Sequence, residues 1–205
     1  MILTLENNEN ALQSATETLQ SGGVCVLPTD TVYGIAASFD DADAIQKLFK
    51  LKKRDSHKSI AVLLADASQA TLVAERISPA AERLMARFWP GGLTVLVQKR
   101  NDLPAGLSAN EKIGLRIPDH TFTRALIRRT GPLATTSANF SGMPPALEIS
   151  DLPVELLSRI PLIIDGGRVK QGVSSTVVDC TVEPVLILRE GGLKTADILA
   201  AFAKE

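Results

Sequence analysis

The hydrophobic positions of this chain alternate between helical and strand-like spacing from one end to the other. Ala11, Leu12, Ala15 and Leu19 recur every three or four positions, which predicts an amphipathic helix that stops at Gly22. Short runs of consecutive apolar residues separate such stretches, and these runs are typical of strands that are buried on both faces.

Two further helices have recognisable first turns. Asp40 or Asp41 is placed to cap a helix that carries Ile45, Leu48 and Leu51 on its inner stripe. Ser78-Pro79 combines a capping hydroxyl with a proline at the first helical position, so a helix is expected after it. The remaining helices are expected near residues 122–129, 153–158 and 195–203.

Strand-like runs lie between these helices along the whole chain. They cover residues 24–27, 33–38, 60–64, 93–99, 113–117, 133–136, 162–164, 176–179 and 185–188. Interleaved strands and helices favour a mixed sheet with helices packed on it. The last two runs are too close for a helical crossover, so we expect an antiparallel pair. The chain is predicted to form a single α/β domain over residues 1–205.

Composition narrows the class of protein. Hydrophobic residues make up 45% of the 205 positions, and no apolar run reaches the ~18 residues needed to span a bilayer. Residues 1–10 lack the pattern of a signal peptide, so we expect a cytoplasmic protein without membrane contact. A net charge of −1 and 4% aromatic residues argue against a protein that mainly grips nucleic acid, although a local basic patch leaves a weak RNA contact open.

Cysteine and histidine usage gives no metal centre. Cys25 and Cys180 stand alone in apolar runs, where cysteine is usually a small buried hydrophobe. His57 and His120 are too few and too far apart for a metal cluster, so no metal-ligating residue is predicted.

A basic run covers residues 47–58, with six cations against the single acid Asp55. Such runs are often a solvated helix face. Lys52, however, lies four positions after Leu48 and therefore falls on the apolar stripe of its helix. A charge placed there is costly unless an anion meets it, and phosphate suits the ammonium of Lys58 and the guanidinium fork of Arg54.

Two polar loops follow strands. Residues 28–34 read PTDTVYG, and their side chains suit either a ligand site or a tight turn in which Thr29, Asp30 and Thr31 satisfy local backbone groups. Residues 137–142 read SANFSG, and they suit either a polar ligand or an Asx-type turn.

Arg116 interrupts an apolar strand and needs an anion, either an acidic partner in the protein or the carboxylate of a ligand. Small hydroxylated or glycine-rich loops recur at residues 172–176 and 189–192. The chain has no Walker A phosphate loop, no GxGxxG at a helix start and no serine-hydrolase elbow. Cations, hydroxyls and glycines together make a nucleotide-using enzyme the first hypothesis.

These segments resemble the YrdC-like threonylcarbamoyl-AMP synthases of the TsaC type. The similarity runs from about residue 9 to residue 193. It is carried by PTDTVYG at 28–34, LKKR at 51–54 with Lys58, FWPGGLT at 88–94, GLRIP at 114–118, TTSANFSG at 135–142, GVSSTVVD at 172–179 and LREG at 188–191. The resemblance implies a twisted open mixed sheet with flanking helices and a concave, basic cavity.

The resemblance also implies a reaction. L-Threonine, bicarbonate and ATP, accompanied by Mg²⁺, would give threonylcarbamoyl-AMP, pyrophosphate and water, a nucleotidyl transfer. Downstream threonylcarbamoyl transferase proteins would use the product to make threonylcarbamoyladenosine in tRNA. The substrates supply both nucleophile and electrophile, so the protein needs only to align them and neutralise charge.

Site residues follow by similarity. Lys52 and Arg54 would be catalytic, holding the phosphates. The implied threonine site comprises Thr31, Arg116, Thr135 and Ser175, and the implied nucleotide site comprises Arg54, Lys58, Ser137, Asn139 and Arg189.

The chain departs from the family pattern at Leu63, where many relatives have a histidine that contacts threonine. It also departs at Lys112 and Pro145, where some members have hydroxyl-bearing residues that contact the nucleotide. It also resembles the short form of the family, which lacks an additional C-terminal domain. Two alternatives therefore stay open: a paralogue that makes a different carbamoyl-adenylate, and a non-catalytic RNA-binding module that uses the basic run.

Overall fold

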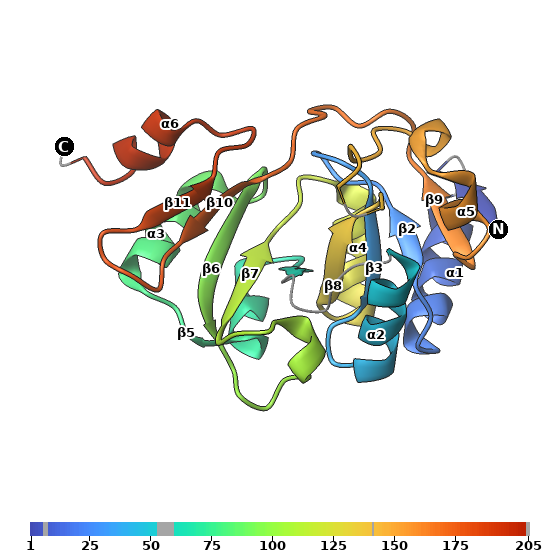
Figure 1. Cartoon of the computed structure of the whole chain (residues 1–205), viewed down its shortest axis with the longest axis horizontal. Helices are drawn as coiled ribbons and strands as arrows, with labels where there is room; N and C mark the ends of the chain where they lie inside the picture. The colour runs from blue at the N-terminus through green and yellow to red at the C-terminus, as the bar shows by residue number, and fades with distance from the viewer. Residues whose placement is uncertain (6–7, 53–59, 141, 204–205) are drawn as a thin grey trace.

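The computed structural model describes residues 1–5, 8–52, 60–140 and 142–203. Within these ranges eleven strands form one mixed sheet, in the order β1-β9-β2-β3-β8-β4-β7-β6-β10-β11, and β5 pairs with β6 off this path (Figure 1). The strands are Ile2–Thr4 (β1), Cys25–Leu27 (β2), Gly34–Ser38 (β3), Ala61–Leu63 (β4), Ala74–Arg76 (β5), Leu93–Lys99 (β6), Lys112–Arg116 (β7), Leu133–Ser137 (β8), Leu162–Asp165 (β9), Thr176–Asp179 (β10) and Leu186–Arg189 (β11).

Helices cover both faces of this sheet. One hydrophobic cluster joins α1 (Asn8–Gln20) and α4 (Thr121–Thr130) to Cys25, Ala36 and Leu63. A larger cluster joins α2 (Ala42–Leu51) and α3 (Pro79–Phe88) to Ile35 and Val62. Because neighbouring strand residues belong to different clusters, successive side chains point to opposite faces. The helices are Asn8–Gln20 (α1), Ala42–Leu51 (α2), Pro79–Phe88 (α3), Thr121–Thr130 (α4), Val154–Leu157 (α5) and Thr195–Ala200 (α6), with 3₁₀ turns at Ala67–Leu72, Ala105–Leu107 and Ile149–Asp151.

The local signals for helix ends are confirmed. Asp41 rather than Asp40 caps α2, since its carboxylate accepts hydrogen bonds from two backbone N–H groups of the first turn. Ser78 caps α3 through the N–H of Ala81, and Pro79 occupies the first turn. Gly22 follows α1 with a φ of 72°, a left-handed conformation that favours glycine.

A strand overlaps each predicted run, and β6 and β10 have the predicted bounds. The pair β10–β11 is antiparallel, as its short connection requires. β1 and β5 were not predicted. β5 contains two exposed charged side chains and therefore lacks an apolar run, and β1 is mostly exposed, unlike the buried central strands.

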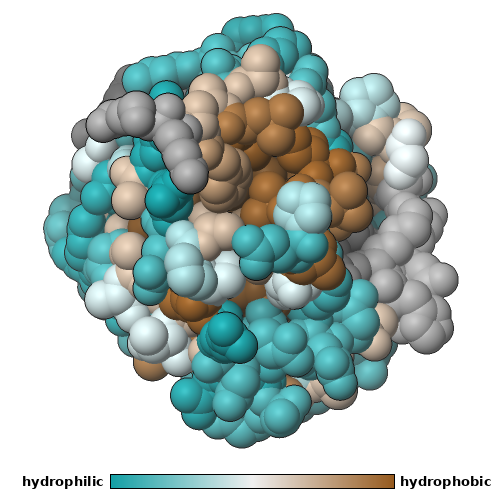
Figure 2. Space-filling model, turned by 90° about the vertical axis from the view of Figure 1, so that its left-hand side faces the viewer, coloured by the Kyte–Doolittle hydropathy of each residue, from teal (hydrophilic) through white to brown (hydrophobic). Residues whose placement is uncertain are grey.

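One end of the sheet is β11, next to α6. Among the described residues this end carries the exposed hydrophobic side chains Val182, Leu186, Leu188 and Leu199. Figure 2 shows a hydrophobic area in the middle of this side of the molecule, bordered by hydrophilic residues. None of the described helices has the length and hydrophobicity that a bilayer crossing requires.

Candidate functional site

A cavity of about 580 Å³ lies against the central part of the sheet. Residues from β3, β4, β6, β7, β8, β10 and β11 and from the loops at residues 29–33 and 174–175 line it. Its size is within the range of ligand pockets, roughly 300–1,000 Å³.

The cavity exists because small side chains meet on one face of the sheet. Ala61 of β4 is paired with Gly114 of β7, and Gly114 is paired with Leu96 of β6. A Cβ atom on Gly114 would approach the methyl carbon of Thr94 to 2.9 Å, and one on Gly34 would approach that of Thr135 to 2.7 Å. Backbone therefore forms part of the floor, where a larger side chain would occupy ligand space.

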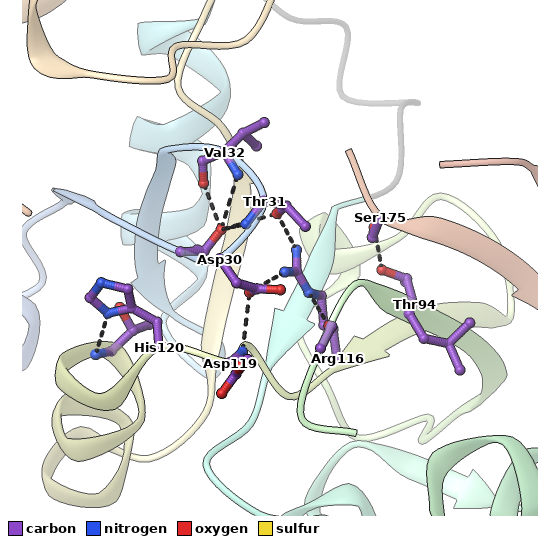
Figure 3. A network of polar contacts seen from close by, with 12 residues as sticks. Asp30, Thr31, Val32, Thr94, Arg116, Asp119, His120 and Ser175 are labelled. Carbon is purple, nitrogen blue, oxygen red and sulfur yellow. Dashed lines mark hydrogen bonds and ion pairs between the residues drawn. The ribbon is translucent and has the colours of Figure 1, made fainter. Parts of the chain in front are cut away.

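Arg116, at the end of β7, lines this cavity and is only 6% exposed. Figure 3 shows its guanidinium directed toward Asp30 and Thr31. Its Nη2 forms an ion pair with Asp30 at 2.5 Å, its Nη1 donates to Thr31 Oγ1 at 2.7 Å, and its Nε donates to the carbonyl of Gly91 at 2.9 Å. Burial lowers the pKa of Arg116, while the neighbouring Asp30 opposes this effect. A guanidinium has five N–H donors, so one N–H on each terminal nitrogen has no partner among the described residues.

The loop at residues 28–34 combines both interpretations that its sequence leaves open. Thr29 makes the local turn, because its Oγ1 accepts from the N–H groups of Thr31 and Val32. The side chains of Asp30 and Thr31 instead reach Arg116. One residue thus fixes the loop, and the next two hold a side chain of the cavity.

Arg189, at the end of β11, also lines the cavity. Its Nε and Nη2 donate to the carbonyl of Ser175 at 3.1 and 2.8 Å, and Ser175 Oγ is 2.8 Å from Thr94 Oγ1. No carboxylate pairs with Arg189 in the part of the chain that the structure describes. Burial lowers the pKa of Arg189, but an arginine keeps its charge. This guanidinium is therefore a positive group available to an anion in the cavity.

Gly191 fixes the backbone beside Arg189. A Cβ atom there would lie 2.1 Å from the carbonyl oxygen of Ser174, a backbone atom. The N–H of Gly191 donates to Thr176 Oγ1 at 2.9 Å. The glycine of this loop thus allows the two chain segments that carry Ser175 and Arg189 to approach each other closely.

Lys52 ends α2 and is only 1% exposed. Its ammonium donates to Thr136 Oγ1 at 3.1 Å, to Asn139 Oδ1 at 3.0 Å and to the carbonyl and hydroxyl of Ser137. Ser137 Oγ in turn donates to Asn139 Oδ1 at 2.6 Å. Thr136 and Ser137 line the cavity, so Lys52 holds one of its walls from behind.

A second ion pair lines the cavity near β10. Lys112 Nζ lies 2.7 Å from Asp179 Oδ2, and Asp179 also accepts from the hydroxyl and the N–H of Thr181. Burial acts to raise the pKa of Asp179, but the hydrogen bonds from Lys112 and Thr181 outweigh it and the pKa is lowered.

The structure gathers most of the predicted site residues. Thr31, Arg116, Thr135, Ser137, Ser175 and Arg189 line the same cavity. Lys52 and Asn139 are hydrogen-bonded to Ser137 in its wall. Arg54 and Lys58 lie outside the described residues.

Three contributors were not predicted as site residues: Asp30, Thr94 and Asp179. Thr94 lies inside FWPGGLT, Asp30 inside PTDTVYG and Asp179 at the end of GVSSTVVD, so all three belong to the motifs that carry the family resemblance. Their roles depend on partners at least 67 positions away, which spacing within a motif does not reveal.

This architecture defines an α/β protein with a polar ligand cavity on an open mixed sheet, and solved structures share it. The chain matches the crystal structure of Pyrococcus abyssi Sua5 complexed with L-threonine with a TM-score of 0.94 and 31% identity, covering 98% of this chain and 60% of that one. It matches E. coli YciO with a TM-score of 0.83 and 25% identity, covering 93% of both chains.

Sequence relatives agree with the structural ones. The chain is 36% identical over 199 residues to the threonylcarbamoyl-AMP synthase of Bacillus subtilis and 34% identical over 182 residues to that of Pyrococcus abyssi. These matches cover 96% and 88% of this chain but 58% and 54% of the relatives, so the chain spans little more than half their length. The Sua5/YciO/YrdC family, described as "Telomere recombination", matches residues 17–191. The chain belongs to this family.

Proposed function

We propose that this chain is an L-threonylcarbamoyladenylate synthase, a nucleotidyltransferase that uses L-threonine, bicarbonate and ATP. The observation that carries the proposal is the meeting of six residues, assigned to threonine or nucleotide by similarity, in one cavity. Relatives of similar sequence carry the name of this activity, and one is described as bound to L-threonine.

The proposed chemistry uses groups of the substrates. The amine of threonine captures carbon dioxide or bicarbonate to give a carbamate, releasing a proton in the first case and water in the second. A carbamate oxygen then attacks the α-phosphorus of ATP, the new P–O bond forms, the bond to the bridging oxygen breaks and pyrophosphate leaves. The protein has to align these parts and stabilise the charge on the phosphates.

Two arginines suit this division of labour. Arg116 keeps two N–H groups without a partner among the described residues, and these suit the threonine carboxylate, with Thr31, Thr135 and Ser175 around it. Arg189 has no carboxylate partner in the same part of the chain and suits the nucleotide, together with Ser137 and Asn139. Arg54 and Lys58 complete the proposed phosphate site, in which Arg54 is the proposed catalytic residue. Lys52 would assist Arg54 from behind the cavity wall, by holding Ser137 and Asn139 in place.

Mg²⁺ belongs to the proposal only as a companion of ATP. The described residues contain no group of three or more His, Cys, Asp or Glu side chains suited to a metal ion. Magnesium commonly keeps several waters and is held by substrate phosphates, so no protein ligand to it is proposed. Cytoplasmic localisation and transfer of the product to tRNA by downstream proteins, with a weak RNA contact at the basic run, are part of the same proposal.

The test is an assay of pyrophosphate release. Release should require threonine, bicarbonate and ATP together. Arg189→Ala should remove about 2 kcal/mol or more of transition-state stabilisation, as loss of one oriented charged donor does. Arg129→Ala is the matched control, because Arg129 is paired with Glu9 on the exposed surface. Equal release without any amino acid would disprove the proposal.

Leu63 favours a second candidate, a paralogue with another amino-acid acceptor. It lines the cavity and is paired with Arg116 across β4 and β7, so an apolar surface lies beside the proposed carboxylate site. The same assay with a panel of amino acids separates the two, since the paralogue would prefer an acceptor other than threonine.

A further inference from the structure

Asp30 lies directly behind the cavity and is only 4% exposed. Its Oδ1 accepts from Arg116 Nη2 at 2.5 Å and from the N–H of Asp119, at the start of α4, at 3.1 Å (Figure 3). Asp30 is absent from the residues that line the cavity, whereas Arg116 is among them. The carboxylate therefore acts on a ligand only through the guanidinium that it holds.

The second oxygen of this carboxylate, Oδ2, is buried and has no hydrogen-bond partner among the described residues. A buried oxygen of a charged group without a partner is costly, and a buried ion pair is a weak source of stability. Fold stability alone is thus a poor explanation for this side chain, and a role in the neighbouring site explains it better.

The acceptors of Arg116 are themselves fixed. The carbonyl of Asp30 accepts from the N–H of Gln171 and that of Thr31 accepts from the N–H of Gly172, both at 3.1 Å. The N–H of Gly91 donates to the carbonyl of Ile117 at 2.9 Å, beside Arg116. Rigid backbone segments therefore hold one long side chain in a single orientation, which reduces the entropy lost on binding.

The charge of the pair matters as much as its geometry. Asp30 neutralises Arg116, whereas Arg189, which also lines the cavity, has no carboxylate partner among the described residues. A polyphosphate carries several negative charges and is drawn to the unpaired cation. A single carboxylate needs only the two oriented N–H groups that Arg116 retains.

We propose that Asp30 is a positioning residue that decides which anion Arg116 accepts. It orients the guanidinium toward the carboxylate of the amino acid and, by cancelling its charge, keeps polyphosphate at the Arg189 side. This inference rests on the proposed function, since it assigns the two arginines to the two substrates of that reaction.

Two substitutions separate orientation from charge. Asp30→Glu keeps the charge but adds a methylene in a buried position, so the guanidinium is displaced. It should raise the KM for the amino acid at least about tenfold, the loss expected for one hydrogen bond to a charged group, and leave the KM for ATP nearly unchanged. Asp30→Asn keeps the size but removes the charge, so tripolyphosphate should become a competitive inhibitor against the amino acid. In the unsubstituted protein it should compete with ATP alone.

Asp102→Asn is the matched control, because Asp102 forms an ion pair with Arg100 on the exposed surface. It should change neither KM nor the inhibition pattern. An unchanged KM for the amino acid in Asp30→Glu, or an equal rise in both KM values, would overturn the proposal. Inhibition of Asp30→Asn directed only against ATP would overturn it too. If Asp30→Asn does not fold, Asp30→Glu alone decides.

A titration with tripolyphosphate distinguishes failure of this inference from failure of the proposed function. Calorimetry needs no turnover, and Asp30→Asn should bind a second equivalent that the unsubstituted protein and Asp102→Asn do not bind. The same stoichiometry in all three would contradict the inference even if the enzyme is active. Absence of pyrophosphate release with any amino acid would instead reject the proposed function, and the titration would still test Asp30.

Discussion

The floor of the cavity offers a test that does not depend on any assigned activity. Gly114→Ala places a methyl group on β7, where the Cβ atom would lie 2.9 Å from the methyl carbon of Thr94. Thr94 cannot rotate without cost, because its hydroxyl is bound to Ser175 Oγ at 2.8 Å. The new methyl group is therefore forced against a side chain whose rotamer is fixed.

The magnitude follows from two opposing effects. Overpacking a well-packed site costs about 1–3 kcal/mol. Replacing glycine by alanine within a strand returns about 0.5–1 kcal/mol of conformational entropy. The difference spans about 0–2.5 kcal/mol, and we expect Gly114→Ala to lower the free energy of unfolding by about 1–2 kcal/mol, the middle of this range.

Thr94→Ser gives the matched partner for a double-mutant cycle. Thr94→Ser keeps the hydroxyl that binds Ser175 and removes the methyl carbon of Thr94, which is the atom that a Cβ at position 114 would meet. Alone, Thr94→Ser should lower the free energy of unfolding by about 1 kcal/mol. In the double variant the added methyl group replaces the lost one, and the total loss should stay below about 1 kcal/mol. The expected coupling is thus about 1–2 kcal/mol.

Urea denaturation of the four proteins measures this coupling, provided that the dependence of the unfolding free energy on urea concentration is the same for all. If the losses of the two single variants simply add in the double variant, the two groups do not compete for space and the described packing of the floor is wrong.

Three further outcomes concern the rest of the fold. Burial raises the pKa of both thiols, that of Cys180 to about 12. A thiol reagent near neutral pH should therefore label the unfolded protein and leave Cys25 and Cys180 of the native protein unmodified. Rapid labelling of the native protein would contradict the burial of these thiols. Ser78→Ala removes the cap of α3 and a bond to the Cys180 carbonyl, and should cost about 1 kcal/mol in urea denaturation, whereas an unchanged midpoint would exclude the capping role. Burial acts to raise the pKa of Asp179, but the hydrogen bonds from Lys112 and Thr181 outweigh it, so the pKa is lowered in the folded protein. The stabilising contribution of Asp179 is therefore present above the pKa of the unfolded state, about 3.9, and is lost as the pH falls through the pKa of the folded state. Asp179→Asn should accordingly reduce the loss of stability in acid, and an identical acid profile would refute this.

Local signals predicted the elements well because their causes are local. The cap at Ser78 and the proline after it need only the first turn of α3 to act. The apolar runs that became β6 and β10 are buried along much of their length, so their composition alone distinguishes them from loops. β1, by contrast, is mostly exposed, and it forms by pairing with the distant strand β9, in register Ile2 to Ile163.

The chemistry of the site was predictable by residue type but not by partner. The sequence shows that Arg116 needs an anion, and it leaves open whether the protein or a ligand provides it. The structure supplies Asp30, 86 positions away, and still leaves two N–H groups without a partner among the described residues. Both alternatives are thus compatible at one residue, because one guanidinium has donors for a fixed carboxylate and for a ligand.

Strand register is the property on which the cavity finally depends. Gly114 and Arg116 face the cavity, while Ile113 and Leu115 between them point into the core on the other face of β7. A slip of one residue against β6 would exchange these pairs, burying a guanidinium in the core and filling the cavity with two large aliphatic side chains. The hydrophobic core therefore selects the register, and by selecting it also brings the small and polar residues of β4, β6 and β7 together on the opposite face. The core and the site are formed by alternate residues of the same strands. A substitution can therefore leave the core intact and still fill part of the cavity, as Gly114→Ala is expected to do.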